Sequence, residues 1–129
     1  MMLFTSGRQT YLMSFSKWKF TIANGLDYEQ QKELYYLYAI PESKKIIREA
    51  FKCVANIDFS KSHAPLLLTS GSNDKLIPSA LSYDNYKKYA AGASVTDYIE
   101  FKVHNHLVFG VPAWKQQADV VLRWLEGII

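Results

Sequence analysis

The spacing of apolar residues along the chain changes character near residue 59. Before that point, apolar residues recur every three or four positions, which is the spacing of one face of a helix. The first such stripe consists of Tyr11, Phe15, Trp18 and Ile22. Asn24-Gly25 is a plausible stop for this helix. We therefore predict that residues 1–58 form a helical region rich in aromatic side chains.

Two further helices are predicted within this region. Asp27 can cap the second helix, with Gln30 three positions later completing a capping box. The apolar side of this helix would carry Leu34, Leu37 and Tyr38. A third helix is predicted to begin at Pro41-Glu42, with an apolar face of Ile46, Ile47, Ala50, Phe51 and Val54.

The second half of the chain reads as strand, helix, strand, helix. Leu66-Leu67-Leu68 is an apolar run without alternation, as expected for a strand covered on both faces. A helix then begins at Pro78-Ser79, and residues 95–103 alternate like an edge strand. The last helix would pack through Trp114, Ala118, Val121, Leu122 and Leu125. This order predicts an α/β fold with two parallel strands joined by a helical crossover.

Composition narrows the class of protein. The 129 residues suit one structural unit, and 49% hydrophobic content argues against disorder. The net charge of +3 comes from mixed charges without a basic block, so we expect no nucleic-acid partner. Residues 1–15 do not form a signal peptide and no apolar run reaches the roughly 20 residues of a membrane span, which predicts a cytoplasmic protein without a membrane partner. Cys53 is expected to be a buried apolar side chain on a helix.

Two polar side chains follow the two predicted strands. Asp74 comes after the first strand and His106 after the second. Since parallel strands end at the same edge of a sheet, both residues are expected to lie there, where open α/β sheets bind ligands. A carboxylate that accepts a hydrogen bond from one imidazole nitrogen leaves the other nitrogen free to act as a base. We interpret the two residues as an acid–base pair.

Other interpretations of these residues stay open. Asp74 is also an ordinary turn residue, and His106 could be a structural histidine. His104, His106 and Asp74 together could supply three metal ligands if the strand continued through residue 106. His63 lies in a loop and is expected to face solvent.

The segments "LLLTSGSNDKLIP" and "FKVHNHLVFGVPAWKQQADVVLRWL" resemble the C-terminal half of an α/β-hydrolase. In that family the acid lies in a Gly-x-x-Asp-x-x-x-Pro turn, which corresponds here to Gly71, Asp74 and Pro78. The catalytic histidine follows the last strand and corresponds to His106, with Leu107 directed toward the pocket. The resemblance covers residues 60–127 well and the N-terminal helices only loosely.

The resemblance implies hydrolysis of an ester or related bond by Ser-His-Asp chemistry, with no metal or organic cofactor. His106 would be the general base and acid, and Asp74 its orienting partner. Residues 1–58 would correspond to a helical cap, and residues 59–129 to the last two strands and helices of the core. Substrate-lining positions would be Trp18, Leu76, Ile77 and Leu107. Aromatic residues of the cap-like region could line the same pocket or simply form core: Trp18, Phe20, Tyr35, Tyr36 and Tyr38.

The chain departs from the family in one decisive respect. The Gly-x-Ser-x-Gly nucleophile elbow is absent, because Ser70 and Ser72 beside Gly71 belong to the acid turn. We therefore expect an incomplete α/β-hydrolase-like fold that is inactive alone and whose serine comes from an upstream segment. The alternative is a non-catalytic, truncated hydrolase that acts as an interaction module. An unpartnered strand at residues 66–70 would then favour a homo-oligomer or a complex with a companion chain.

Overall fold

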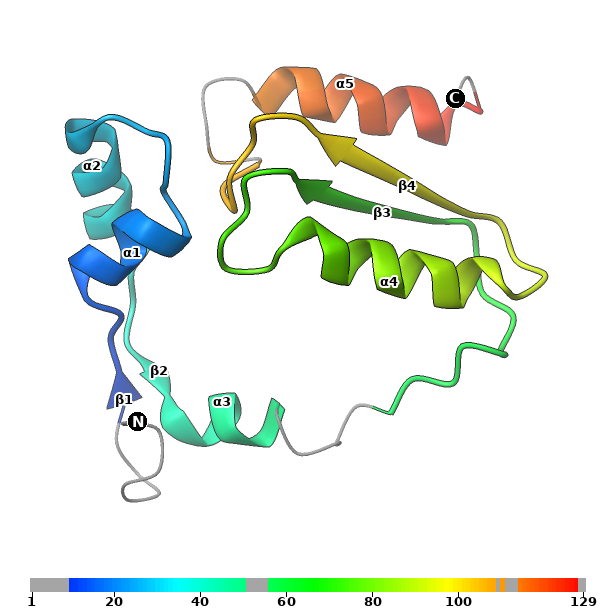
Figure 1. The fold of residues 1–129 in the computed structure, drawn as a ribbon, viewed down its shortest axis with the longest axis horizontal. Coiled ribbons are helices and arrows are strands. Elements are labelled where there is room, and N and C mark those ends of the chain that lie inside the picture. The colour runs from blue at the N-terminus through cyan, green and yellow to red at the C-terminus, as the bar shows by residue number, and fades with distance from the viewer. Residues whose placement is uncertain (1–9, 51–55, 109, 111–113, 128–129) are drawn as a thin grey trace.

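The computed structural model describes residues 10–50, 56–108, 110 and 114–127 of a mixed α/β chain (Figure 1). The N-terminal part contains two-residue strands and three helices: β1 (Thr10–Tyr11), α1 (Phe15–Thr21), α2 (Tyr28–Tyr38), β2 (Glu42–Ser43) and α3 (Lys44–Ala50). The C-terminal part follows the predicted order: β3 (Leu66–Gly71), α4 (Ser79–Ala90), β4 (Thr96–Phe101) and α5 (Trp114–Leu125).

Strands β3 and β4 pair in parallel, as the sequence predicts. Their register runs from Leu66 opposite Thr96 to Gly71 opposite Phe101. Helix α4 connects them and packs on one side of the pair, where the ring of Tyr98 lies 5.3 Å from Tyr83 and 5.8 Å from Tyr86. Helix α5 lies on the other side (Figure 1). The face of β4 that carries Tyr98 is therefore covered by α4.

The core of the N-terminal part is small and aromatic. Trp18, Ile22 and Ala23 are buried at its centre. The side chains packed around them are Met13, Phe15, Leu26, Leu34, Tyr35, Ala39 and Leu107. The predicted capping box is confirmed, since the Gln30 N–H donates to Asp27 Oδ1 at 2.9 Å and the Asp27 N–H to Gln30 Oε1. Because Leu107 belongs to the C-terminal part, this core joins the two halves of the chain.

Two N-terminal predictions were wrong. Tyr11 is not helical: it pairs with Glu42 in the β1–β2 ladder, and α1 begins only after the N-cap Ser14. Leu34 packs on the core as predicted, but Leu37 and Tyr38 are exposed, because Tyr35 takes their place in the packing of α2.

The third predicted helix begins later than expected, since Glu42–Ser43 form β2 before α3 starts at Lys44. Ile46, assigned to its apolar face, is exposed. Three predicted residues, Phe51, Cys53 and Val54, lie outside the described residues.

Helix α5 packs through a face that overlaps only partly with the predicted one. Of the predicted residues, Ala118 and Val121 are half-buried. Trp114, Leu122 and Leu125 are exposed, whereas Gln117 is buried with 2% of its surface accessible. Polar contacts explain the difference. Gln117 hydrogen bonds to His104, and the Trp124 indole N–H donates to Asp97 Oδ2 at 2.7 Å. These contacts orient the helix against the strands and leave much of its apolar stripe outside.

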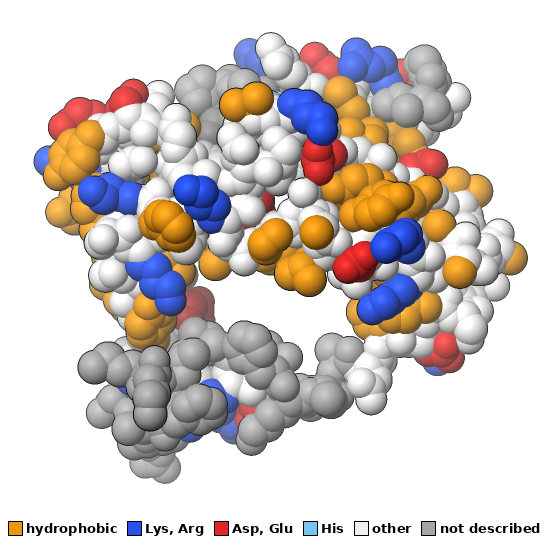
Figure 2. All heavy atoms as spheres, viewed as in Figure 1, with side chains coloured by type: hydrophobic (Ala, Val, Ile, Leu, Met, Phe, Trp, Pro, Cys, Tyr) orange, Lys and Arg blue, Asp and Glu red, His pale blue; other side chains and the backbone are white. Residues whose placement is uncertain are grey.

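The elements meet near the carboxyl ends of the parallel strands. Both arrows in Figure 1 point toward α1 and α2, which lie beyond the ends of β3 and β4. Apolar side chains also reach the surface around α4, among lysine and aspartate residues (Figure 2), and include Leu76, Ile77, Leu81 and Tyr83. Within the described residues, no helix is both long and apolar enough to cross a membrane.

Candidate functional site

The acid turn follows β3 at residues 71–77. The Asp74 N–H donates to the Gly71 carbonyl at 3.1 Å, which closes the turn. Asp74 Oδ1 accepts hydrogen bonds from the backbone N–H groups of Leu76 and Ile77, both at 2.8 Å. These bonds hold the carboxylate and leave Oδ2 to project out of the turn.

The histidine turn follows β4 at residues 102–107, and one backbone and one side-chain hydrogen bond hold it beside the acid turn. The Asn73 N–H donates to the His104 carbonyl at 2.8 Å. The Val103 N–H donates to Ser72 Oγ at 2.8 Å. The two turns therefore form one structural unit at the end of the sheet.

Gly71 allows this close approach. A Cβ atom at Gly71 would lie 2.3 Å from the His104 carbonyl oxygen and 2.8 Å from that of Asn105. Real Cβ atoms essentially never come so close to a backbone oxygen. The glycine of the Gly-x-x-Asp pattern is thus required because a neighbouring backbone occupies the space of a side chain.

Val103 gives the histidine turn an unusual backbone. Its φ of 63° lies in the left-handed region, which disfavours β-branched residues. Such a conformation costs roughly 1–2 kcal/mol. It breaks the extended path of β4, so the side chains that follow are not placed as they would be on a strand.

His106 and Asp74 lie in direct contact. His106 Nδ1 is 2.8 Å from Asp74 Oδ2, and their side chains are 32% and 8% exposed. An ionised carboxylate only accepts hydrogen bonds, so Nδ1 carries the proton, and in the neutral ring Nε2 presents a lone pair. No residue in the described part of the chain bonds to Nε2. The arrangement can therefore accept a proton at Nε2 and stabilise the resulting imidazolium, while a catalytic role for the pair stays a prediction.

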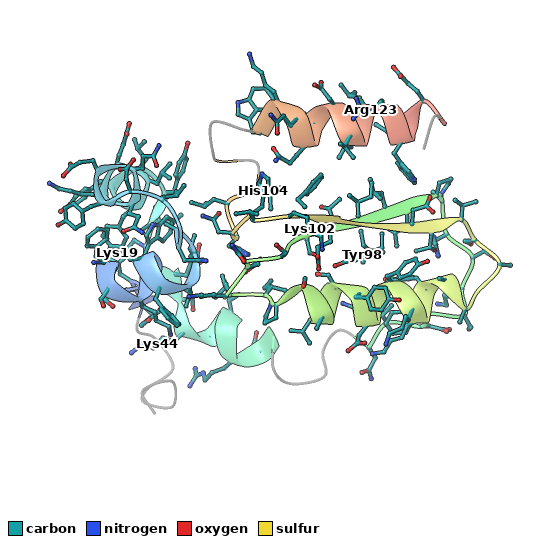
Figure 3. The ribbon with its side chains drawn as sticks, turned by 45° about the horizontal axis from the view of Figure 1, so that its top comes forward. Lys19, Lys44, Tyr98, Lys102, His104 and Arg123 are labelled. Carbon is teal, nitrogen blue, oxygen red and sulfur yellow. The ribbon has the colours of Figure 1, made fainter. Side chains whose placement is uncertain are left out.

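His104 faces away from this pair. Its Nδ1 is 2.6 Å from the Lys102 carbonyl, and its Nε2 contacts the Gln117 side chain at the start of α5 (Figure 3). The three-ligand cluster of His104, His106 and Asp74 is not formed, because the turn at Val103 sends the two histidines to different partners. The described residues contain no group of three His, Cys, Asp or Glu side chains placed to hold a metal ion.

Charges near the histidine turn are paired at the surface. The Lys102 ammonium donates to the Glu100 carboxylate. This hydrogen bond is the main reason that the pKa of Glu100 is lowered and that of Lys102 raised. Glu100 therefore neutralises the positive charge of Lys102 at the start of the histidine turn.

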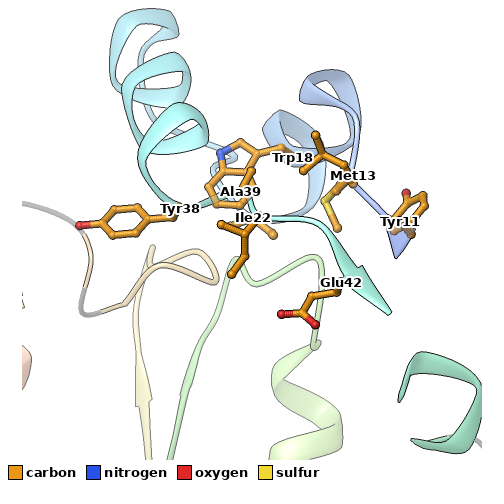
Figure 4. A pocket seen from close by; sticks show the side chains of 9 residues that line it. Tyr11, Met13, Trp18, Ile22, Tyr38, Ala39 and Glu42 are labelled. Atoms are coloured by element: carbon orange, nitrogen blue, oxygen red, sulfur yellow. The ribbon is translucent and has the colours of Figure 1, made fainter. Parts of the chain in front are cut away.

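The predicted substrate-lining residues are distributed over the acid turn and the N-terminal core, and their role in lining a substrate pocket stays a prediction. Leu76 and Ile77 are exposed on the acid turn, and Leu107 packs on the N-terminal core. Trp18 lies in that same core and also lines a cavity of about 260 Å³ (Figure 4). Its other lining residues are Tyr11, Leu12, Met13, Ile22, Tyr38, Ala39, Ile40 and Glu42.

The remaining aromatic and histidine predictions divide between core and surface. Tyr35 packs in the core, as the core interpretation expects, while Phe20 and Tyr36 are exposed. His63 was expected to face solvent but is half-buried, with its ring 5.3 Å from Tyr89.

Sequence reasoning missed two asparagines that contact the site. Asn105 is buried between the two histidines, and its Nδ2 donates to the Asn24 carbonyl at 2.9 Å. Asn24 Nδ2 in turn donates to the Asn73 carbonyl at 2.8 Å. Side-chain to backbone bonds over 81 and 49 positions leave no periodic signal in a sequence. Comparison of the chain with protein-family models, curated proteins and solved structures found no match.

Proposed function

We propose that this chain supplies the base and the orienting acid of a Ser-His-Asp hydrolase of the α/β-hydrolase type, acting on an ester or related bond. The observation that carries the proposal is the 2.8 Å contact between His106 Nδ1 and Asp74 Oδ2 at the carboxyl ends of two parallel strands. Its support from sequence is the ordered pair of a Gly-x-x-Asp-x-x-x-Pro turn and a histidine turn after the next strand.

In the proposed reaction, His106 Nε2 accepts the serine hydroxyl proton as the serine oxygen attacks the substrate carbonyl. Asp74 holds the imidazole and stabilises the positive charge formed on it. The imidazolium then gives its proton to the leaving alcohol, and an acyl-serine remains. Water, deprotonated by His106, releases the acid and restores the serine.

The serine of this scheme comes from a segment or chain that carries the nucleophile elbow, since the printed sequence contains no Gly-x-Ser-x-Gly. Residues 1–58 would act as the cap of the site. Their helices α1 and α2 lie beyond the ends of β3 and β4 (Figure 1), and the turns that contain Asp74 and His106 follow these strands.

The proposal is tested by serine labelling in complexes purified from the natural host. A fluorophosphonate probe reacts with serines that a neighbouring base activates. We expect labelling of a serine in complexes that contain the wild-type chain and a loss of about a thousandfold or more in labelling rate with His106→Ala or Asp74→Asn. His63→Ala is the matched control, because His63 lies before β3 and bonds to the Ala64 carbonyl.

Equal labelling with the wild-type chain and His106→Ala would contradict the proposal. The chain by itself makes a second comparison. Because this chain lacks the elbow, we expect it to show no hydrolysis of p-nitrophenyl acetate that requires His106. Robust turnover by the purified chain that is lost in His106→Ala would show that the chain already contains the nucleophile.

A second candidate function is a non-catalytic module for association. It is favoured by the strand pair itself, because neither β3 nor β4 has another neighbouring strand within the described residues. Strand edges without partners, beside exposed Trp114, Leu122 and Leu125 on α5, are surfaces on which another chain can pair. In that case assembly would persist in His106→Ala and Asp74→Asn.

A further inference from the structure

Asn105 lies between the two histidines and is held on both sides. Only 6% of its surface is accessible. Its Nδ2 donates to the Asn24 carbonyl at 2.9 Å, and its Oδ1 accepts the Leu107 N–H at 2.9 Å. The second bond shapes the backbone around His106, and the first ties that backbone to the end of α1.

Asn24 contacts both turns of the candidate site. Its carbonyl accepts from Asn105 in the histidine turn, and its side chain donates to the Asn73 carbonyl in the acid turn at 2.8 Å. Asn73 and Asn105 directly precede Asp74 and His106. A single N-terminal residue is therefore bonded to the positions before both members of the pair.

Asn24 itself is anchored by the N-terminal core. The preceding Ala23 is fully buried, with its N–H bonded to the Trp18 carbonyl at 3.1 Å. The Ala23 carbonyl accepts from the Gln31 side chain of α2 at 3.1 Å. Leu107 packs on the same core, directly after His106. The helices α1 and α2 thus hold the histidine turn through a polar bridge and an apolar contact.

We infer that Asn24 and Asn105 are positioning residues, which hold the Asp74–His106 pair in its productive geometry and couple it to the packing of α1 and α2. Their role as positioning residues for catalysis rests on the proposed function, whereas their effect on the geometry of the pair does not. Neither side chain bonds to His106 or Asp74. They act on the two backbones between which the 2.8 Å contact is formed.

The test uses Asn105→Asp, which keeps the shape of the side chain and the acceptor for Leu107. It replaces the donor to Asn24 with an oxygen that faces a carbonyl oxygen. The readout is the tautomer of His106, measured by long-range proton–nitrogen NMR in mildly alkaline buffer. The bonded pair holds His106 as the Nδ1–H tautomer, and we expect the ratio of this tautomer to the Nε2–H form to fall about fivefold, the effect of one lost hydrogen bond.

Asn24→Ala provides a second variant, since it removes only the donor to the Asn73 carbonyl and leaves the Asn24 carbonyl in place. We expect the same direction of change. Asn85→Asp and Asn85→Ala are the matched controls, because Asn85 is exposed on α4, and they should leave the His106 tautomer unchanged.

An unchanged tautomer ratio in folded Asn105→Asp and Asn24→Ala, even with a lower melting temperature, would overturn the inference and leave a purely structural role. This readout requires no serine and no substrate. If the tautomer ratio shifts but serine labelling is the same with His106→Ala, the two asparagines position the pair and the proposed hydrolase function is wrong. If the tautomer ratio is unchanged but serine labelling requires His106, the proposed hydrolase function holds and the positioning role of the two asparagines is wrong.

Discussion

Gly71 is the residue at which the acid turn and the histidine turn come closest. Its missing side chain leaves room for the carbonyl oxygens of His104 and Asn105. Both turns are held by backbone hydrogen bonds, so neither can move away without losing several of them. The contact therefore transmits any added volume to the loop that carries His106.

Gly71→Ala is expected to lower the free energy of unfolding by about 2 kcal/mol, the usual cost of overpacking a filled site. The added methyl group must displace the His104 carbonyl, from which it would otherwise lie 2.3 Å away. Urea denaturation measures the change. Gly110→Ala is the control, because the nearest atom that a Cβ there meets among the described residues is 3.5 Å away. A loss no larger than that of the control would show that the histidine turn moves freely.

Individual residues of the site differ in how far the sequence predicts them. Asp74 and His106 were found because each lies in a local pattern and because parallel strands bring their ends together. The bridge from Asn24 could not be found in this way. It uses one backbone carbonyl and one side chain across 81 and 49 positions, and it depends on how α1 packs against the end of the sheet.

Among the elements, α5 shows how polar contacts can override an apolar stripe. Its packing against the strands is set by the Gln117–His104 contact and by the bond from Trp124 to Asp97. Both partners lie in β4 or the turn after it. These two contacts accompany the half-buried Ala118 and Val121, while Leu122 and Leu125 of the same stripe remain exposed.

Trp124→Phe tests this orientation, since it removes the indole N–H and keeps most of the aromatic surface. The half-buried Asp97 carboxylate would lose a donor at 2.7 Å. We expect the free energy of unfolding to fall by about 1.5–3 kcal/mol, as for a hydrogen bond to a charged group. Trp114→Phe on the same helix is the control and should change it by less than about 0.5 kcal/mol, because Trp114 is exposed. Equal losses from the two variants would contradict the role of Asp97.

Elements were predicted best where the signal is local. The capping box at Asp27 and the parallel β3–β4 pair depend on neighbouring residues and on a short crossover. Tyr11 was assigned to a helix because it continues the stripe of α1, but the N-cap at Ser14 excludes it and β2 pairs with it. That pairing joins residues 31 positions apart and has no counterpart in the apolar spacing.

At the scale of the whole molecule, two surfaces lack a partner in the described part of the chain. One is formed by the outer edges of β3 and β4, and the other by the apolar residues of α5. A two-stranded sheet is only marginally stable unless other elements pack against it. The association predicted from the sequence would cover both surfaces.

We expect the purified chain to associate as its concentration rises, in light-scattering measurements. Leu122→Lys should weaken this association, because it places a charge within the apolar surface of α5. Gln116→Lys adds the same charge to the exposed part of the same helix and should have little effect. A chain that stays monomeric at high concentration would contradict this prediction.

Asp74 and His106 belong to a single crossover unit, with Asp74 between β3 and α4 and His106 in the turn directly after β4. The base and its acid therefore belong to one continuous block of the polypeptide, from residue 65 to residue 107. Any rearrangement of the coding sequence outside this block would pass both groups on together. A break between α3 and β3 would separate them from Asn24 and from the N-terminal core on which Leu107 packs, so the pair could be inherited intact while the contacts that align it are lost.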